Sequence, residues 1–163
     1  MNIFVLDKNP KYAAQYHCDK HVCKLIIESG QMLCKAHIHS GNSQVPYGGK
    51  GFMNHPCSVW VRSSINNYRW LIKMSLYLCK EYTHRYGRIH KTQQVIEWAR
   101  DNEPNIPNIS MTPFVQAMPD DVKDVDAVQA YRNYYLKYKS YFAKWAKGRD
   151  TPYWYTRKLP ENP

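Results

Sequence analysis

Residues 57–86 read CSVWVRSSINNYRWLIKMSLYLCKEYTHRY, and the spacing of apolar side chains in this stretch decides the class of fold. Apolar residues recur every three or four positions, which places them on one face of an α-helix. The residues with this spacing are Val59, Trp60, Ile65, Tyr68, Leu71, Ile72, Leu76 and Leu78. Gly87 is a natural stop, because glycine readily adopts the left-handed backbone that ends helices. The stretch therefore predicts one long helix from about Cys57 to Tyr86.

Three further helices are expected, over residues 11–37, 91–101 and about 126–148. Asn9 and Pro10 fit the N-cap and first position of the first helix, and Asp124 or Asp126 can cap the last. Segment 103–119 contains four prolines, which exclude a long helix or a central strand. We predict an all-α fold: a single compact helical domain over residues 1–163, with a short N-terminal arm and long irregular loops.

The composition indicates a polyanionic partner. A net charge of +10 over 163 residues favours nucleic acid, a nucleotide or an anionic membrane surface. The membrane is the weakest of these, because no apolar run approaches the roughly 20 residues of a spanning helix. The five cysteines are odd in number and form no CxxC pair. They are expected to be reduced thiols in the cytoplasm, and no zinc site or other cofactor is indicated.

The C-terminal segment 131–158 interleaves cations with aromatic rings. Cations neutralise phosphates and rings stack on bases, so this pattern is typical of a nucleic-acid surface. The alternative is a helix whose tyrosines pack in a core while its lysines are solvated. The basic residues are Arg132, Lys137, Lys139, Lys144, Lys147, Arg149, Arg157 and Lys158. Tyr153, Trp154 and Tyr155 are the rings that we expect to support a DNA strand.

The first helix carries an unusual polar stripe. His17, His21, Lys24 and Glu28 lie within roughly 60° of one another on a helical wheel. Paired histidines favour a catalytic or substrate-binding face, although an ordinary solvated stripe is the alternative. The spacing of the two histidines also suits a metal ion, but a third ligand would have to come from elsewhere. The candidates for that ligand are His55, Cys57 and His90.

Asp19 falls on the apolar side of the same wheel, where an unpaired carboxylate is costly. One interpretation makes it a partly buried acid that transfers protons. The other makes it a structural acceptor for the N-terminal arm or for an arginine such as Arg62 or Arg69. Its neighbour Lys20 lies at the edge of the polar stripe and is a candidate for phosphate binding.

Two further groups are candidates for substrate binding. Asn54 and His55 precede the helix that starts near residue 57, where free backbone N–H groups favour phosphate or an oxyanion. The alternative for Asn54 is simple helix capping. Arg85 and His90 combine charge and ring character near the end of the same helix, where a cation is favoured in any protein.

Several motifs resemble the pyrimidine-dimer DNA glycosylases of the phage endonuclease V type. They are AAQYH at residues 13–17 and RDTPYWYTRK at residues 149–158, combined with a short N-terminal arm. HCDKHV (17–22), NHPC (54–57) and TPFVQAMP (112–119) are also similar to a group of uncharacterised small phage proteins. The resemblance implies a small, basic, all-α enzyme that acts on DNA, in the host cytoplasm if the gene is carried by a phage.

The resemblance also implies a mechanism, from which this chain departs. The family uses the free α-amine of its second residue as nucleophile, assisted by a glutamate on the first helix. Here residue 2 is Asn2, which we expect to bind substrate. An initiator methionine is normally kept before such a residue, and the glutamate position falls near Lys24. Lys20 or Lys24 is therefore an alternative nucleophile, if nearby positive charge on the histidines holds its amine neutral.

These features favour an enzyme that acts on the N-glycosidic bond of a base in DNA or a nucleotide. In that hypothesis Asp19 is the base or stabilises a cationic sugar, and His17 and His21 position the substrate. The partner is nucleic acid, DNA more than RNA, or a nucleotide. The alternatives are a non-catalytic phage DNA- or RNA-binding modulator, and a small-nucleotide hydrolase or transferase.

Overall fold

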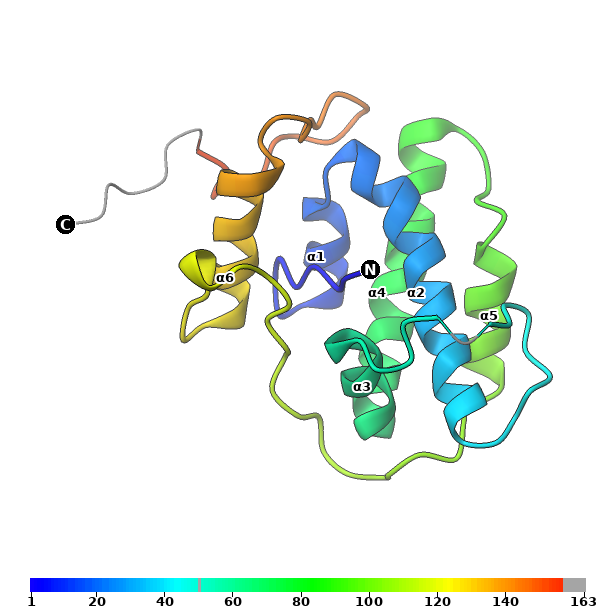
Figure 1. The fold of residues 1–163 in the computed structure, drawn as a ribbon. Helices are drawn as coiled ribbons and strands as arrows, with labels where there is room; N and C mark the ends of the chain where they lie inside the picture. The colour runs from blue at the N-terminus through cyan, green and yellow to red at the C-terminus, as the bar shows by residue number, and fades with distance from the viewer. Residues whose placement is uncertain (50, 157–163) are drawn as a thin grey trace.

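A computed structural model describes residues 1–49 and 51–156 of the chain. Its described residues form six α-helices and no β-strand, which confirms the all-α prediction (Figure 1). A 3₁₀ turn at Asp120–Val122 precedes the last α-helix, and a π-helical turn at Tyr135–Lys139 continues it. The helices are α1 (Pro10–Tyr16), α2 (Asp19–His39), α3 (Pro56–Ser63), α4 (Ile65–Tyr86), α5 (Gln93–Asp101) and α6 (Ala127–Tyr134).

Helix α4 is the centre of the domain, because it contacts α1, α2, α3 and α5. Figure 1 shows α2 and α4 side by side, with α5 on one side of this pair and α6 on the other. The N-terminal arm runs through the interior, where Ile3, Phe4, Val5 and Leu6 are all buried. Burial of the arm fixes the start of the chain against the helices, as burial of apolar area stabilises any core.

Two of the predicted helices are each divided in two, and tertiary contacts explain both breaks. Ser64 separates α3 from α4 with an extended backbone (φ −152°, ψ 139°). Its hydroxyl donates to the Ile109 carbonyl, and the Ile65 N–H donates to the Pro107 carbonyl. The proline-rich segment 103–119 therefore takes over bonds that a continuous helix would make within itself. These partners lie more than 40 residues away in the sequence, so the local spacing of apolar residues does not predict them.

The first predicted helix breaks at His17 and Cys18, between α1 and α2. The Cys18 N–H donates to the Tyr135 hydroxyl (3.3 Å), and the Asp19 N–H donates to the Lys144 carbonyl (2.9 Å). These bonds to the C-terminal part satisfy N–H groups that a helix start leaves free. The break therefore sets the course of the segment that follows α6.

The last predicted helix is shorter than expected: regular helical structure ends at Lys139 rather than near Gly148. The following segment 140–156 is irregular and returns to α1 and α2. There the Trp145 indole N–H donates to the Tyr16 carbonyl, which holds the segment against the first helix break. Asp126, one of the two predicted N-cap residues, caps α6: its side chain accepts from the Val128 N–H.

Within the described part of the chain, no helix is long and apolar enough to cross a membrane.

Candidate functional site at the N-terminal arm

The start of the N-terminal arm lies against Glu28 on α2. The α-amine of Met1 is 3.5 Å from Glu28 Oε1, and the backbone N–H of Asn2 donates to Glu28 Oε2 at 3.3 Å. The Glu28 side chain is only 14% exposed, so this carboxylate is partly shielded from solvent. Because each carboxylate oxygen faces one of the first two nitrogens of the chain, an amine on either residue would lie beside the same acid.

Asn2 anchors the arm through every polar atom of its side chain. Its Oδ1 accepts from the Tyr131 hydroxyl (3.0 Å), the Cys57 thiol (3.5 Å) and the Ile3 N–H (2.8 Å). Its Nδ2 donates to the Ala117 carbonyl at 2.8 Å. These partners come from α6, α3 and the proline-rich segment, so the end of the arm is held from three directions. Asn2 was expected to bind substrate, but its side chain is committed to the protein.

His55 and Asn54 lie at the start of α3. His55 is near the Met1 amine and Glu28. The His55 Nδ1 accepts from the Cys57 N–H at 3.1 Å, so a neutral ring carries its proton on Nε2. Burial lowers the pKa of His55, the N-terminal amine acts in the same direction, and Glu28 opposes both. His55 is therefore the N-cap of α3, rather than Asn54. The Asn54 side chain is exposed and makes no hydrogen bond to the described residues, which leaves its amide available to a substrate.

Lys24 extends the polar surface beside Glu28. Its Nζ is 4.0 Å from Glu28 Oε1, and its side chain is 66% exposed. One turn towards the N-terminus, the Lys20 ammonium lies over the Phe142 ring at 5.1 Å from the centroid. The Lys139 ammonium lies in a similar way over the Tyr134 ring at 4.9 Å. The lysines come from α2 and from the turn after α6, and the rings come from α6 and from segment 140–156. Together with Glu28 we call these residues the basic aromatic surface.

The predicted exposed stripe of paired histidines is wrong, because His17 and His21 are buried. Burial lowers the pKa of His17 to about 4 and that of His21 to about 2. The His17 Nδ1–H donates to the Ala13 carbonyl, and His21 Nδ1 bonds to the Tyr135 hydroxyl, each at 2.6 Å. Both rings are therefore neutral at pH 7. They supply no positive charge that could hold Lys20 or Lys24 neutral.

The helical wheel assumed one continuous helix, but His17 lies in the break between α1 and α2. The His17 and His21 rings still lie beside each other, with centroids 6.4 Å apart, but they lie in the interior and not on an exposed face. No group of three or more His, Cys, Asp or Glu side chains among the described residues is arranged to hold a metal ion. The histidines are instead part of the core, with Phe4 packed beside both rings.

Asp19 belongs to a buried charge cluster that connects the first helix break to α4. Its Oδ1 lies 3.2 Å from Arg85 Nη1, and its Oδ2 accepts from the Ala146 N–H at 2.9 Å. Arg85 also bonds to Glu81 Oε2 (2.9 Å), and Glu81 pairs in turn with Arg149. The structural interpretation of Asp19 therefore fits the geometry, with Arg85 as the partner in place of Arg62 or Arg69.

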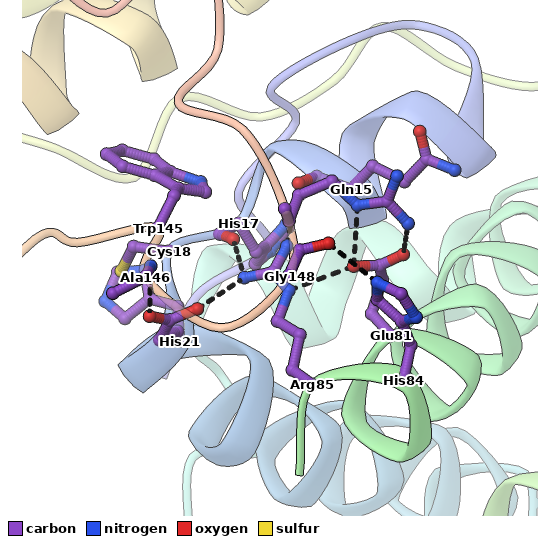
Figure 2. Close-up of polar contacts among 12 residues, drawn as sticks. Gln15, His17, Cys18, His21, Glu81, His84, Arg85, Trp145, Ala146 and Gly148 are labelled. Carbon is purple, nitrogen blue, oxygen red and sulfur yellow. Dashed lines mark hydrogen bonds and ion pairs between the residues drawn. The ribbon is translucent and has the colours of Figure 1, made fainter. Parts of the chain in front are cut away.

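Arg85 was expected to bind substrate, but its side chain is fully buried. It donates to the carbonyls of His17 (2.7 Å) and Gln15 (2.8 Å), besides the two carboxylates. Figure 2 shows Arg85 pointing from α4 towards the break between α1 and α2. These bonds use four of the five guanidinium N–H groups, so the buried Arg85 holds the break between α1 and α2 against α4.

His90 was also expected to bind substrate, and both of its ring nitrogens are used within the protein. Nε2 donates to the Cys23 carbonyl at 3.2 Å, and Nδ1 accepts from the Thr92 N–H at 3.0 Å. Its ring packs edge-on against Tyr82. His90 therefore connects the start of α5 to α2 and offers no free nitrogen to a ligand.

The C-terminal segment divides its rings between core and surface. Tyr131 and Tyr135 are fully buried, whereas Tyr141 and Tyr153 are 83% and 77% exposed. The Tyr153 hydroxyl accepts from Arg132, whose guanidinium also lies over the Tyr153 and Trp154 rings. Trp154 and Tyr155 are half-buried and pack on Tyr135 and Trp145 respectively. Arg157 and Lys158 lie outside the described residues.

Comparison with known proteins defines the class of the chain. The model of the pyrimidine dimer DNA glycosylase family matches residues 1–95, which is more than half of the chain and includes the arm, Glu28 and His55. The chain belongs to this family, and it is a DNA glycosylase-like enzyme that acts on DNA bases. No curated protein and no solved structure matches the chain.

The main residue that sequence reasoning missed is Glu28 as the partner of the chain start. Glu28 was recognised only as a member of the polar stripe, and the family's glutamate was expected near Lys24. The contact between Glu28 and Met1 joins residues 27 positions apart through the buried arm. The apolar run at residues 2–6 indicates a buried arm, but the spacing of residues in the sequence does not predict which turn of α2 the arm contacts.

Proposed function

We propose that this protein removes a damaged pyrimidine from duplex DNA at the site formed by the chain's α-amine and Glu28. The observation that carries the proposal is the placement of the first two backbone nitrogens against Glu28, at 3.5 and 3.3 Å, inside the family-matched region. An amine and a carboxylate in contact supply a nucleophile and a group that exchanges protons with it.

In the first step, the lone pair of the neutral amine forms a bond to C1′ of the deoxyribose. The bond between C1′ and the base breaks, and its electron pair leaves on the base, which takes up a proton. Glu28 accepts the proton that the amine loses. A protonated Glu28 then returns a proton to O4′ as the sugar ring opens, which leaves an imine between the amine and C1′. Water adds to the imine carbon and releases the sugar aldehyde and the free amine.

The substrate strand binds along the basic aromatic surface that starts at Glu28. Lys24 and Lys20 lie on α2 and Lys139 lies after α6, so their ammonium groups can neutralise successive phosphates. Asn54 offers an unused amide at the edge of the site, and the exposed ring of Tyr141 can stack on an unpaired base. We assign DNA rather than RNA because the matching family acts on DNA, and a duplex rather than a free nucleotide because this surface suits several phosphates.

We assign a structural role to Asp19, His17 and His21: they stabilise the fold that positions the site and do not contact substrate. Asp19 accepts from the Ala146 N–H, His17 Nδ1 bonds to the Ala13 carbonyl, and His21 Nδ1 bonds to the Tyr135 hydroxyl. We place the protein in the cytoplasm, that of the host if a phage carries the gene. All five cysteines are free thiols, which fits a reducing compartment.

The test compares Glu28→Gln with a matched control, Glu103→Gln, which makes the same change at an exposed carboxylate. Release of the base from its deoxyribose is measured on a duplex with one pyrimidine dimer and on undamaged duplex as the abasic site that it leaves, detected by strand scission in alkali, because the cut base of a dimer stays joined to its neighbour. On the free nucleotide it is measured as free base. We expect the Glu28→Gln variant to bind the duplex and to lose release by roughly 100-fold or more, the scale of a lost acid–base group. The control and an Asp19→Asn variant that folds should retain release.

Three results would contradict the proposal. Full activity of the Glu28→Gln variant would remove Glu28 from the chemistry. Tight binding of DNA with no base released from any duplex would instead fit a non-catalytic modulator. Turnover of free nucleotide in preference to damaged duplex would indicate a small-nucleotide hydrolase.

A further inference from the structure

Phe52 combines an exposed ring with an unfavourable backbone conformation. The residue is 62% exposed, and its φ of 62° lies in the left-handed region that bulky residues rarely adopt. Among the described residues, Phe52 is the only one other than glycine with a positive φ. A glycine would adopt this backbone without strain. Phe52 therefore lowers the stability of the fold through its backbone and regains little by burial.

The Phe52 ring also lacks the contacts that the other phenylalanines make. Phe4, Phe114 and Phe142 each pack against another aromatic ring. Phe52 packs against no aromatic ring of the described residues, and it lies outside the core. The ring is therefore available to a partner outside the chain.

The turn that carries this ring is nevertheless fixed. The Phe52 carbonyl accepts from the His55 N–H at 3.1 Å, and the next carbonyl, that of Met53, accepts from the Arg62 guanidinium. On the other side of Phe52, a Cβ added to Gly51 would meet no atom of the described residues within 4 Å. The ring is thus held in open space by a bonded turn, so little freedom is lost when it enters a binding partner.

The same turn lies beside the proposed catalytic site. It leads directly into α3, where the Cys57 thiol is 3.5 Å from Asn2 Oδ1. The Asn2 N–H donates in turn to Glu28. The exposed Asn54 side chain lies between Phe52 and α3 in the chain. A duplex that places its damaged base at Glu28 is therefore expected to pass close to the Phe52 ring.

We propose that Phe52 inserts its ring into the base stack of the bound duplex, next to the damaged pyrimidine. The inference rests on the proposed function, because the damaged base must leave the stack before its glycosidic bond is reached. Phenylalanine and other apolar side chains enter between base pairs and replace part of the lost stacking. Lys20 and Lys24 are placed to hold the DNA backbone while the ring enters. A single ring is too small for a stable protein interface, but it can fill the space that one base leaves.

The emission of a fluorescent aminopurine reports the insertion without turnover. This base is placed next to the dimer in the duplex, where stacking quenches it and unstacking restores its emission. The Glu28→Gln variant is used so that the substrate stays intact, and fluorescence anisotropy follows binding in parallel. We expect the emission to rise on binding. Adding Phe52→Ala should retain binding and lose most of the rise, since losing one stacked ring shifts the unstacking equilibrium by roughly 5- to 150-fold.

Three further variants serve as controls. Ile109→Ala removes another exposed apolar side chain and should keep the full rise. The Ile109 carbonyl accepts from Ser64, which follows α3, so this residue lies at the opposite end of α3 from Phe52. Phe52→Trp keeps a ring and should also keep the rise. Phe52→Gly removes the ring and the unfavourable φ together, so its Tm should equal or exceed that of the wild type.

The outcomes separate this inference from the proposed function. An unchanged rise with Phe52→Ala, or the absence of a rise with Glu28→Gln alone, would overturn the inference. A Tm of Phe52→Gly clearly below that of the wild type would also overturn it, because the ring would then be structural. Base release by the wild type tests the function itself. A rise that depends on Phe52, without any base release, would support the inference and refute the function.

Discussion

Acid should destabilise this protein through two of its three buried histidines, His17 and His21, and the structure gives the size of the effect. His17 and His21 are neutral in the folded state because burial lowers their pKa from 6.5 to about 4 and about 2. In the unfolded chain both rings regain a pKa near 6.5. Between these values the unfolded state binds more protons than the folded state, so stability rises with pH in this window. The contribution is complete above pH 6.5 and is lost progressively as the pH falls below it.

The magnitude follows from the width of the window. For His17 the window from pH 6.5 to about 4 is about 2.5 pH units wide, and each is worth about 1.36 kcal/mol. The loss is therefore about 3 kcal/mol by pH 4. The window of His21 extends further, to about pH 2, so this residue loses a similar amount by pH 4. Since a small domain is stable by about 5–15 kcal/mol, the two together remove a large part of the total.

Urea denaturation at pH 7, 6, 5 and 4 measures the effect as the free energy of unfolding. His21→Leu removes one titrating ring, and we expect this variant to lose about 3 kcal/mol less than the wild type between pH 7 and pH 4. His39→Leu is the control, because His39 is exposed at the end of α2, and its curve should follow that of the wild type. Identical pH dependence of the wild type and His21→Leu would refute the assignment of a buried neutral histidine.

Further predictions concern the charge cluster, the basic surface and the tail. Arg85→Met leaves Glu81 without its buried partner and should lower the free energy of unfolding by about 3–5 kcal/mol. Urea denaturation at pH 7 measures this change, and a loss below 1 kcal/mol would contradict the prediction. Lys20→Ala and Lys24→Ala should each reduce the slope of log affinity against log salt by about 0.9 in duplex binding, and an unchanged slope would exclude phosphate contacts. Tyr153→Ala should weaken binding of single-stranded DNA by about 1–3 kcal/mol in a titration. Thermal stability should be nearly unchanged, because the ring is 77% exposed. Unaltered binding would remove this ring from the interface.

The sequence predicted the all-α class because local periodicity is strong where a helix buries one face. Residues 65–86 have this periodicity, and α4 ends at Tyr86 with Gly87 as its cap, as expected. The breaks at Ser64 and at Cys18 were missed because remote carbonyl and hydroxyl groups hold them open. Pattern reasoning counts only neighbours in sequence, so it extends a helix wherever the apolar spacing continues.

The site was predicted less well than the fold, for the same reason. Two histidines at i, i+4 spacing suggested an exposed catalytic face. Their rings do lie together, with centroids 6.4 Å apart, but Phe4 of the buried arm packs against both. Glu28 received little weight because its partner is the start of the chain, which reaches it through a buried segment. Local composition left two alternatives for the basic aromatic segment, a nucleic-acid surface or a helix that packs its tyrosines in the core, and its rings are divided between the core and the surface.

The C-terminal third of the chain lies beyond the family match, yet it supports the N-terminal site. The Tyr131 hydroxyl on α6 donates to Asn2 Oδ1 and also bonds to the Val115 carbonyl, so α6 and the proline-rich segment hold the residue next to the amine. The Ala146 N–H and Arg149 complete the buried cluster around Asp19 and Glu81, which ties the same part of the chain to α2 and α4. Because Glu28 also lies on α2, loosening the C-terminal part would disturb both the arm and the helix that carries its acid. The chemistry of residues 1–95 therefore depends on packing against residues that the family model does not describe.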